Sequence, residues 1–429
     1  MVDSDSFGSI KKTLAILSGS KIALWDLPED TAIGNNGAAG ADVNETNMRF
    51  FDPYPQYGDG VPISSLAWNH NQMVIATSSG IPTEEFPHDN IVLLSSQSGQ
   101  KLDAFQHDSE WKQKQQYAQQ QDSVHHGSIV NSINFGGKSR YLCIGDEYGA
   151  VCLWDLKKKL RVRQFFHKKL GSPDARVGNA NGSVVSSPSL QVSLDPTDTF
   201  VMSLSPWAMY QYNLRDGQLV AIMEVPKDDE GNSSNDKNMF TAFAISNIEH
   251  NICAIGTEGG SVYLYDILNQ ATIPHSKIQR RHGGAVTGLT FSPDNPNILF
   301  SSGTDGVVFV HNKANGTSHK VCGVLNDNGS IESLSLHADG VTCAIGCESG
   351  DVYVYDLRYI IDGGQIPATL LASYRASEPI NSLCFAPPPK AKDQQQMKPG
   401  MQSQMNHQNE STTQQQQPIS PTSSKNTSH

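Results

Sequence analysis

The sequence predicts a closed all-β fold, a propeller of seven four-stranded sheets with a disordered segment after it. Three observations predict this fold. A unit of short alternating strands recurs along the chain, about seven such units fit the period of roughly 40 to 45 residues typical of propeller repeats, and one unit is split between the two ends. The composition agrees, because 37% hydrophobic residues with 36 Gly and 22 Pro are typical of a globular, turn-rich protein.

Two copies of the unit are clear along their whole length. Each begins with an alternating strand and continues with a short apolar strand that ends in a small residue. A tight turn containing Asp or Gly follows, and then a strand that ends in an aromatic residue and Asp or Asn. The two copies run from residue 129 to residue 156 and from residue 285 to residue 312.

This plan resembles the WD repeat, in which a Trp-Asp pair ends the third strand. The resemblance implies structural roles for the residues at these positions, and for a His-Gly pair that precedes a repeat. The literal pairs are Trp25-Asp26 and Trp154-Asp155, the close variants are Tyr265-Asp266 and Tyr355-Asp356, the looser ones are Tyr212-Asn213 and His311-Asn312, and Leu94-Ser95 departs from the pattern. The His-Gly pairs are His126-Gly127 and His282-Gly283.

The resemblance also implies a polar network inside the sixth blade. There we expect His282 to share a hydrogen bond with Asp305, joined by Ser301 or Ser302. We interpret this network as structural, because no oxyanion-hole motif accompanies its Ser, His and Asp residues.

The two ends of the chain each carry part of one blade. The N-terminal part begins in mid-repeat with the apolar strands 14–18 and 21–27, and residues 379–385 form an innermost strand without partners. Joined, they make a complete blade and leave no open sheet edge. The domains we expect are a disordered segment 1–12, a propeller 13–386, and a disordered tail 387–429 rich in Gln, Ser and Thr.

Charge, cysteines and motifs narrow the function. The net charge of −12 does not fit a nucleic-acid binder, so we expect proteins as partners. The sequence shows neither a membrane span nor a signal peptide, which favours the cytoplasm. We expect a monomeric propeller within a larger complex. The seven cysteines form no CxxC pair and are expected as reduced core residues. No metal-site, phosphate-binding or catalytic motif is present, which predicts a non-enzymatic protein without metal or cofactor.

Surface features suggest where partners bind. Long polar insertions at 28–47, 80–89, 107–125, 168–183 and 226–238 interrupt otherwise short turns, and four of the five are expected on one face, as sites of binding or as neutral loop growth. A basic run favours either an acidic partner or a solvated outer strand. Its residues are Lys157, Lys158, Lys159, Arg161 and Arg163. Ser187 and Ser420 are candidate phosphorylation sites, each followed by Pro, and Ser420 lies in the expected tail.

Longer stretches resemble one family of WD-repeat proteins. They are residues 60–68, 90–96 and 344–358, and they resemble the propeller of the NEDD-type adaptor family that targets the γ-tubulin ring complex. The irregular third strand that ends in Ser95-Ser96 is shared with that family. The resemblance implies a role at the centrosome and spindle in microtubule nucleation, with the propeller docking on spindle or pole components. The Gln-rich tail departs from the family's helical C-terminal region, so the resemblance carries over the docking part of the role.

A second family resemblance supports an alternative. Tyr355-Asp356-Leu357-Arg358 resembles the WDxR box of substrate receptors in cullin-RING ubiquitin ligases, where the Arg contacts the ligase adaptor. The structural alternative is that Arg358 pairs with an acidic residue of a neighbouring blade. A generic scaffold of another complex remains a further alternative.

Overall fold

The computed structural model describes residues 12–27, 47–55, 61–79, 90–105, 129–147, 149–167, 189–226, 239–269, 274–278, 281–324, 329–358 and 368–388. The chain divides into two compact units, Met1–Pro388 and Pro389–His429. Within the described ranges the regular elements are 28 β-strands, and all of them belong to the first unit. The described residues contain no helix that is long and apolar enough to cross a membrane.

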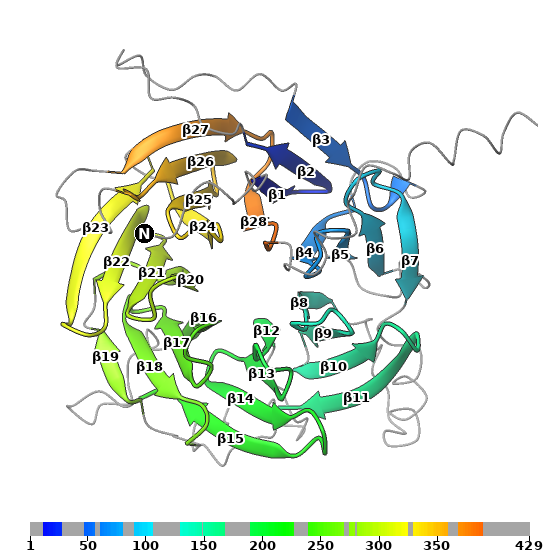
Figure 1. The fold of residues 1–429 in the computed structure, drawn as a ribbon, viewed down its shortest axis with the longest axis horizontal. Helices are drawn as coiled ribbons and strands as arrows, with labels where there is room; N and C mark the ends of the chain where they lie inside the picture. The colour runs from blue at the N-terminus through cyan, green and yellow to red at the C-terminus, as the bar shows by residue number, and fades with distance from the viewer. Residues whose placement is uncertain are drawn as a thin grey trace, which may run out of the picture. The chain divides into compact units, whose positions relative to one another are not determined.

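The strands form seven antiparallel sheets of four strands each, arranged as a ring, so the predicted seven-bladed propeller is confirmed (Figure 1). Blades are numbered from the N-terminus, and their strands are given from the innermost to the outermost. Blade one is β28 (Ile380–Phe385), β1 (Thr13–Ser18), β2 (Lys21–Asp26) and β3 (Met48–Phe51); blade two is β4 (Ile63–Trp68), β5 (Val74–Ser79), β6 (Ile91–Ser95) and β7 (Lys101–Phe105); blade three is β8 (Val130–Phe135), β9 (Tyr141–Asp146), β10 (Ala150–Asp155) and β11 (Leu160–Phe166).

The other four blades follow in chain order. Blade four is β12 (Gln191–Leu194), β13 (Phe200–Leu204), β14 (Ala208–Asn213) and β15 (Leu219–Glu224); blade five is β16 (Phe240–Ile245), β17 (Ile252–Thr257), β18 (Val262–Asp266) and β19 (Ser276–Ile278). Blade six is β20 (Val286–Phe291), β21 (Ile298–Gly303), β22 (Val307–Asn312) and β23 (Thr317–Gly323); blade seven is β24 (Ile331–Leu336), β25 (Thr342–Cys347), β26 (Asp351–Asp356) and β27 (Thr369–Arg375).

Burial of the strands follows their place in the blade. The middle strands are covered on both faces by the neighbouring blades, so β25 and β26 are buried at every residue. The outermost strands are covered less, and β11 has only one buried residue, Phe165. This explains why the middle strands are continuous apolar runs while the outer strands are polar and harder to detect.

Blade one closes the ring as the sequence predicts. Strand β28 from the C-terminal side pairs with β1 from the N-terminal side, with Leu14 opposite Phe385 and Ile16 opposite Leu383. The amide of Ala386 donates to the carbonyl of Thr13, which extends the ladder by one bond. In the blade that both ends of the chain complete, β1 is therefore paired along both of its edges.

Lys12, immediately before β1, ties blade one to blade seven. Its ammonium lies 2.7 Å from Asp339 Oδ2 and donates to Thr342 Oγ1 at 2.9 Å. Burial alone would raise the pKa of Asp339, but hydrogen bonds from His337, Lys12 and Thr342 outweigh burial and hold that pKa far below its ordinary value. Lys12, which the sequence assigns to the N-terminal segment, thus takes part in closure.

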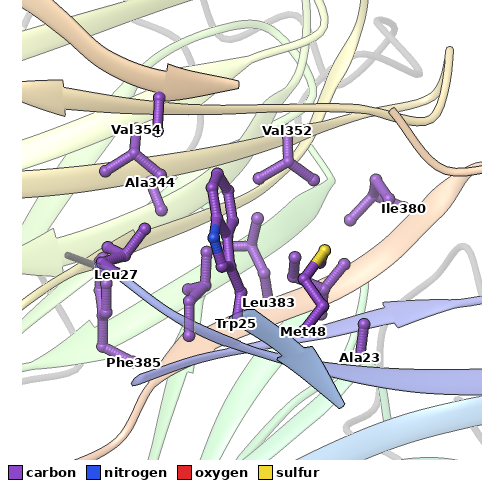
Figure 2. Packing of buried hydrophobic residues seen from close by; sticks show 13 residues of the cluster. Ala23, Trp25, Leu27, Met48, Ala344, Val352, Val354, Ile380, Leu383 and Phe385 are labelled. Carbon is purple, nitrogen blue, oxygen red and sulfur yellow. The ribbon is translucent and has the colours of Figure 1, made fainter. Parts of the chain in front are cut away.

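The hydrophobic core is divided among the seams of the ring. Seven buried apolar clusters lie between the seven pairs of neighbouring blades, one at each seam. At the seam of blades seven and one, Trp25 packs beside Val352 and Val354 (Figure 2). The seven cysteines are free thiols, and six of them are buried in these seams, whereas Cys384 is partly exposed.

The ring has two faces with different loops. We call one the connection face, where each outermost strand leads to the next blade and the second strand turns into the third. The opposite one is the turn face, where the first strand turns into the second and the third into the fourth. Of the five predicted insertions, 28–47 leaves from the turn face and the other four leave from the connection face, as their flanking strands require. The insertions themselves lie largely outside the described residues.

Candidate interaction surfaces

The aspartates of the WD-type pairs close the turn between the third and fourth strands. Asp155 accepts from the amide of Lys158, Asp266 from the amides of Leu268 and Asn269, and Asp356 from the amide of Arg358. Asn213 and Asn312 do the same in blades four and six, which explains why Asn replaces Asp there. In blade one, Asp26 Oδ1 instead accepts from Thr13 Oγ1 at 2.7 Å. In blades three to seven the Asp or Asn side chain therefore stabilises the turn between the third and fourth strands, as in an Asx turn.

Asp155, Asp266 and Asp356 have a lowered pKa, and for two of them an arginine contributes to the shift. Burial favours their neutral form, but hydrogen bonds outweigh it: Arg140 lowers the pKa of Asp155, and Arg358 lowers the pKa of Asp356. The Arg140 guanidinium donates to Asp155 Oδ2 at 2.9 Å. Both aspartates thus act as ionised, internally paired groups and not as acid–base catalysts.

The aromatic residues of the pairs reach across the seams. The hydroxyl groups of Tyr212, Tyr265 and Tyr355 each donate to the backbone carbonyl of the last residue in the outermost strand of the preceding blade. Trp154 packs against Phe105 of blade two, with ring centroids 4.8 Å apart. Trp25 lies 6.3 Å from the ring of Tyr374 in blade seven. In five blades the aromatic position therefore joins neighbouring blades.

Blade six uses the same position differently, because His311 replaces the aromatic residue. Its Nε2 lies 2.7 Å from Ser301 Oγ, and Ser301 Oγ lies 2.7 Å from His282 Nε2. His282 Nδ1 lies 3.0 Å from Asp305 Oδ1, and His311 Nδ1 lies 2.8 Å from Ser318 Oγ. Ser301, and not Ser302, is therefore the hydroxyl between the two imidazoles. We call these five residues the blade-six relay.

One set of proton positions satisfies each bond of the relay. Ser318 donates to His311 Nδ1, His311 Nε2–H to Ser301, Ser301 to His282 Nε2, and His282 Nδ1–H to Asp305. Burial, together with the nearby His282, lowers the pKa of His311 to about 3, which keeps its ring neutral. Ser301 is completely buried, so no substrate reaches its hydroxyl and the Ser–His–Asp grouping is structural.

Blades two and three each contain half of this arrangement. In blade two, Thr77 occupies the strand position of Ser301, but Leu94 stands where His311 would be. In blade three, Trp154 is present and Ile144 replaces the hydroxyl residue. Accordingly, Thr77 Oγ1 and Trp154 Nε1 are both buried without a hydrogen-bond partner within the described part of the chain.

The predicted basic run forms the outer corner of blade three on the turn face. Lys157 and Lys158 are exposed at the tip of the β10–β11 turn, and Lys159 Nζ lies 2.7 Å from Asp103 Oδ2 of blade two. Further along β11, Arg161 NH1 contacts Cys152 Sγ at 3.9 Å. Arg163 donates to the carbonyl of Arg215 in blade four at 2.7 Å. The run therefore spans the outer edges of three blades.

Arg358 lies at the turn face of blade seven. Its guanidinium donates through Nε to Asp356 Oδ2 at 2.8 Å, while 59% of its side chain stays exposed. The expected pairing with an acidic residue of a neighbouring blade stays a prediction, and the partner that the structure gives is Asp356 of the same blade. The reason is local: Asp356 ends β26, and its second oxygen already accepts from the amide of Arg358, which places the side chain beside it.

Two surface features escaped sequence analysis. Trp207, in the β13–β14 turn on the connection face, is 59% exposed, although its Ser-Pro-Trp setting gives no periodic signal. On the same face, Ser64, Thr304, Glu332 and Glu348 from three blades line a cavity of about 700 Å³. Its lining comes from residues far apart in the chain, which a single sequence does not bring together.

His126, Ser187 and Ser420 lie outside the described residues. Across the described ranges, no group of three or more His, Cys, Asp or Glu side chains is arranged to hold a metal ion.

Comparison with known proteins agrees with this architecture. Residues 275–312, which end with the third strand of blade six, match the WD domain, G-beta repeat family. Protein NEDD1 of Homo sapiens is 22% identical over 364 residues, which cover 84% of this chain and 43% of that protein. The chain is a seven-bladed propeller with a WD-type repeat, and it is similar to NEDD1. Bovine NEDD1 is 28% identical over 104 residues, which cover 24% of this chain and 15% of that protein.

Solved structures show the same fold. The C-terminal WD40 domain of Sif2 has a TM-score of 0.54 at 15% identity, with 87% of this chain and 86% of that chain covered. The Cps50 (Swd1) propeller of Myceliophteria thermophila has a TM-score of 0.55 at 12% identity, with 76% of this chain and 90% of that chain covered. The NEDD1-like chain therefore has a WD40 propeller as its scaffold, and it spans less than half the length of human NEDD1.

Proposed function

We propose that this chain is a non-catalytic adaptor that helps to localise the γ-tubulin complex at the centrosome and mitotic spindle, where microtubules are nucleated. The observation that carries the proposal is the extent of the similarity to human NEDD1, which covers 84% of the chain. The WD-repeat family itself matches only residues 275–312. The likeness to NEDD1 therefore runs along the ring and is not confined to one repeat.

The geometry supports a docking role for the propeller. The polar networks of the blades are engaged internally, since WD-type aspartates stabilise turns and the three central residues of the blade-six relay, His282, Ser301 and His311, are buried. The exposed features are an acidic cavity and an exposed tryptophan on the connection face and a basic corner on the turn face. A rigid ring with distinct surfaces is suited to hold partners in place, as loops and rims of rigid scaffolds do.

The proposal is tested by affinity purification of the tagged full chain from dividing cells, with a tagged WD40 propeller of unrelated function as the control. We expect γ-tubulin complex, centrosome or spindle proteins to be enriched on this chain and not on the control. Microscopy of the same tagged chain should show it at spindle poles in mitosis. Recovery of none of these proteins, together with diffuse staining, would contradict the proposal.

The ubiquitin-ligase alternative makes a different prediction for the same experiment. A substrate receptor would bring down a cullin adaptor, and Arg358→Ala would abolish that recovery. Because Asp356 holds the Arg358 guanidinium within blade seven, we expect no cullin adaptor with either chain. Adaptor recovery that is lost in Arg358→Ala would replace our proposal with the receptor role.

A further inference from the structure

Blade three carries a local excess of positive charge that the fold itself does not require. Residues 136–147 and 149–167 contain three carboxylates, Asp146, Glu147 and Asp155, and seven basic side chains. We call the seven the basic crest: Lys138, Arg140, Lys157, Lys158, Lys159, Arg161 and Arg163. The whole chain has a net charge of −12, so the crest is opposite in sign to its surroundings.

Internal ion pairs position the crest and leave its tip exposed. Arg140 pairs with Asp155 at 2.9 Å, and Lys159 pairs with Asp103 at 2.7 Å. Arg163 binds a neutral backbone carbonyl, that of Arg215, at 2.7 Å. Between these fixed points, the side chains of Lys157 and Lys158 extend from the turn into solvent.

The backbone of the crest is strained at one of its charges. Lys159 has a φ of 54°, in the left-handed region. The corresponding turns of blades two, four and six have Gly99, Gly217 and Gly316 at this position, four residues after the end of the third strand. Glycine adopts this conformation without steric cost, whereas lysine does not. Blade three thus places a positive charge where the turn favours glycine, and strain of this kind is common at functional sites.

The range of electrostatic forces makes the crest a separate surface. At physiological salt the Debye length is about 8 Å, so a ligand at this corner responds to the crest and much less to the distant negative charges. The ligand class must therefore be anionic.

The side chains around the crest favour a polypeptide over a nucleic acid. Single-stranded nucleic acids bind on exposed aromatic rings, but the Tyr141 ring beside the crest is covered by the Arg140 guanidinium, 5.0 Å from its centroid. The apolar side chain that continues the turn is Leu160, which is 46% exposed. An aliphatic contact among positive charges suits a peptide in which acidic residues flank an aliphatic residue.

We propose that the basic crest of blade three is a docking surface for an acidic polypeptide segment that carries an aliphatic residue among its carboxylates. The charge complementarity and the lysine kept at a glycine position support it. The inference does not depend on the γ-tubulin proposal, because it concerns the chemistry of the ligand and not its identity.

The test uses the full chain and a fluorescein-labelled synthetic peptide in which pairs of Glu flank Leu, measured by fluorescence anisotropy. We expect saturable binding that weakens with added salt, and no binding of the same peptide with Gln in place of Glu. The double variant Lys157→Glu with Lys158→Glu should bind about tenfold more weakly. Lys320 is also exposed and lies on the outer strand of blade six, so Lys320→Glu is the control and should bind as the wild type does.

The variant Lys159→Gly separates binding from folding. Glycine relieves the left-handed strain, so this variant should melt no lower than the wild type while its affinity for the Glu peptide falls about threefold. The proposal is overturned if the wild type does not bind the Glu peptide saturably, or if Lys320→Glu weakens binding as much as the double variant. Unchanged affinity in Lys159→Gly, or binding of labelled duplex DNA in place of the peptide, also overturns it.

Discussion

Blades one and six use the same strand position in opposite ways. In blade one, Trp25 is 1% exposed and packs into the seam with blade seven (Figure 2). In blade six, His311 is equally buried, but its ring bonds to Ser301 and Ser318 of its own blade. The first residue joins two blades through apolar contact, and the second stabilises one blade through hydrogen bonds.

The difference shows that the same repeat position can stabilise either the contact between two blades or the interior of a single blade. Apolar packing at the seam is insensitive to pH but sensitive to lost volume. A buried polar relay is insensitive to small changes in volume but sensitive to an unpaired donor or acceptor, and to protonation. Substitutions at the two positions should therefore differ in size and in pH dependence.

The largest effect is expected from Trp25→Ala, which removes a ring from the closing seam. We expect the free energy of unfolding to fall by about 3 to 5 kcal/mol, because the cavity opens between the blade that both chain ends complete and its neighbour. Chemical denaturation of the purified chain measures it. Trp207→Ala is the matched control: Trp207 is 59% exposed, so a change within about 0.5 kcal/mol is expected. Equal losses in both variants would contradict the seam role of Trp25.

The sequence predicts the number of blades and the closure of the ring better than it predicts the contacts that particular side chains make in each blade. Seven blades and the split blade follow from strand patterns and from the WD-type pairs, because the middle strands are buried on both sides and keep a clear apolar signal. Trp25 is recognised from the Trp-Asp pair that ends such a strand, and His282 from the His-Gly pair that precedes its repeat. The role of His311 is not, since a histidine in place of an aromatic residue looks like decay of the repeat until the hydroxyl of Ser301 is seen between two rings.

A smaller effect is expected when the central hydroxyl of the relay is removed. Ser301→Ala removes the hydroxyl that the Nε2 atoms of His282 and His311 share, which should cost about 2 to 3 kcal/mol of unfolding free energy. Thr77→Val in blade two is the matched comparison, because the buried Thr77 hydroxyl has no partner within the described residues. That change should be neutral or stabilising by up to about 1 kcal/mol. A loss in Thr77→Val as large as in Ser301→Ala would mean that the relay adds nothing to blade six.

Partners that lie in other repeats account for what the sequence misses. Arg140 and Asp155 are 15 residues apart, yet they meet across two strands of one blade. Lys12 and Asp339 meet only because the ring closes, and Arg163 finds a backbone carbonyl of the next blade. Residue type and spacing identify such groups as charged surface positions, but the choice of partner depends on how blades are set against each other.

The smallest effect, and the one that distinguishes the two blades most directly, is a pH dependence that belongs to His311. Its pKa is about 3 in the folded protein and about 6.5 in an unfolded chain. Between these two pH values the unfolded state binds more protons at position 311 than the folded state does. The stability that depends on a neutral His311 is therefore complete above pH 6.5 and is lost as the pH falls toward 3. From pH 7 to pH 5 the loss should be about 1 to 2 kcal/mol. The variant His311→Phe removes the titrating ring. Its unfolding free energy should be lower than that of the wild type at pH 7, but it should fall less between pH 7 and pH 5. Trp25→Ala keeps the ring of His311, so its unfolding free energy should depend on pH as that of the wild type does. Denaturation curves of the three proteins at pH 5 and pH 7 measure this, and parallel losses in all three would show that His311 is protonated alike in the folded and unfolded states.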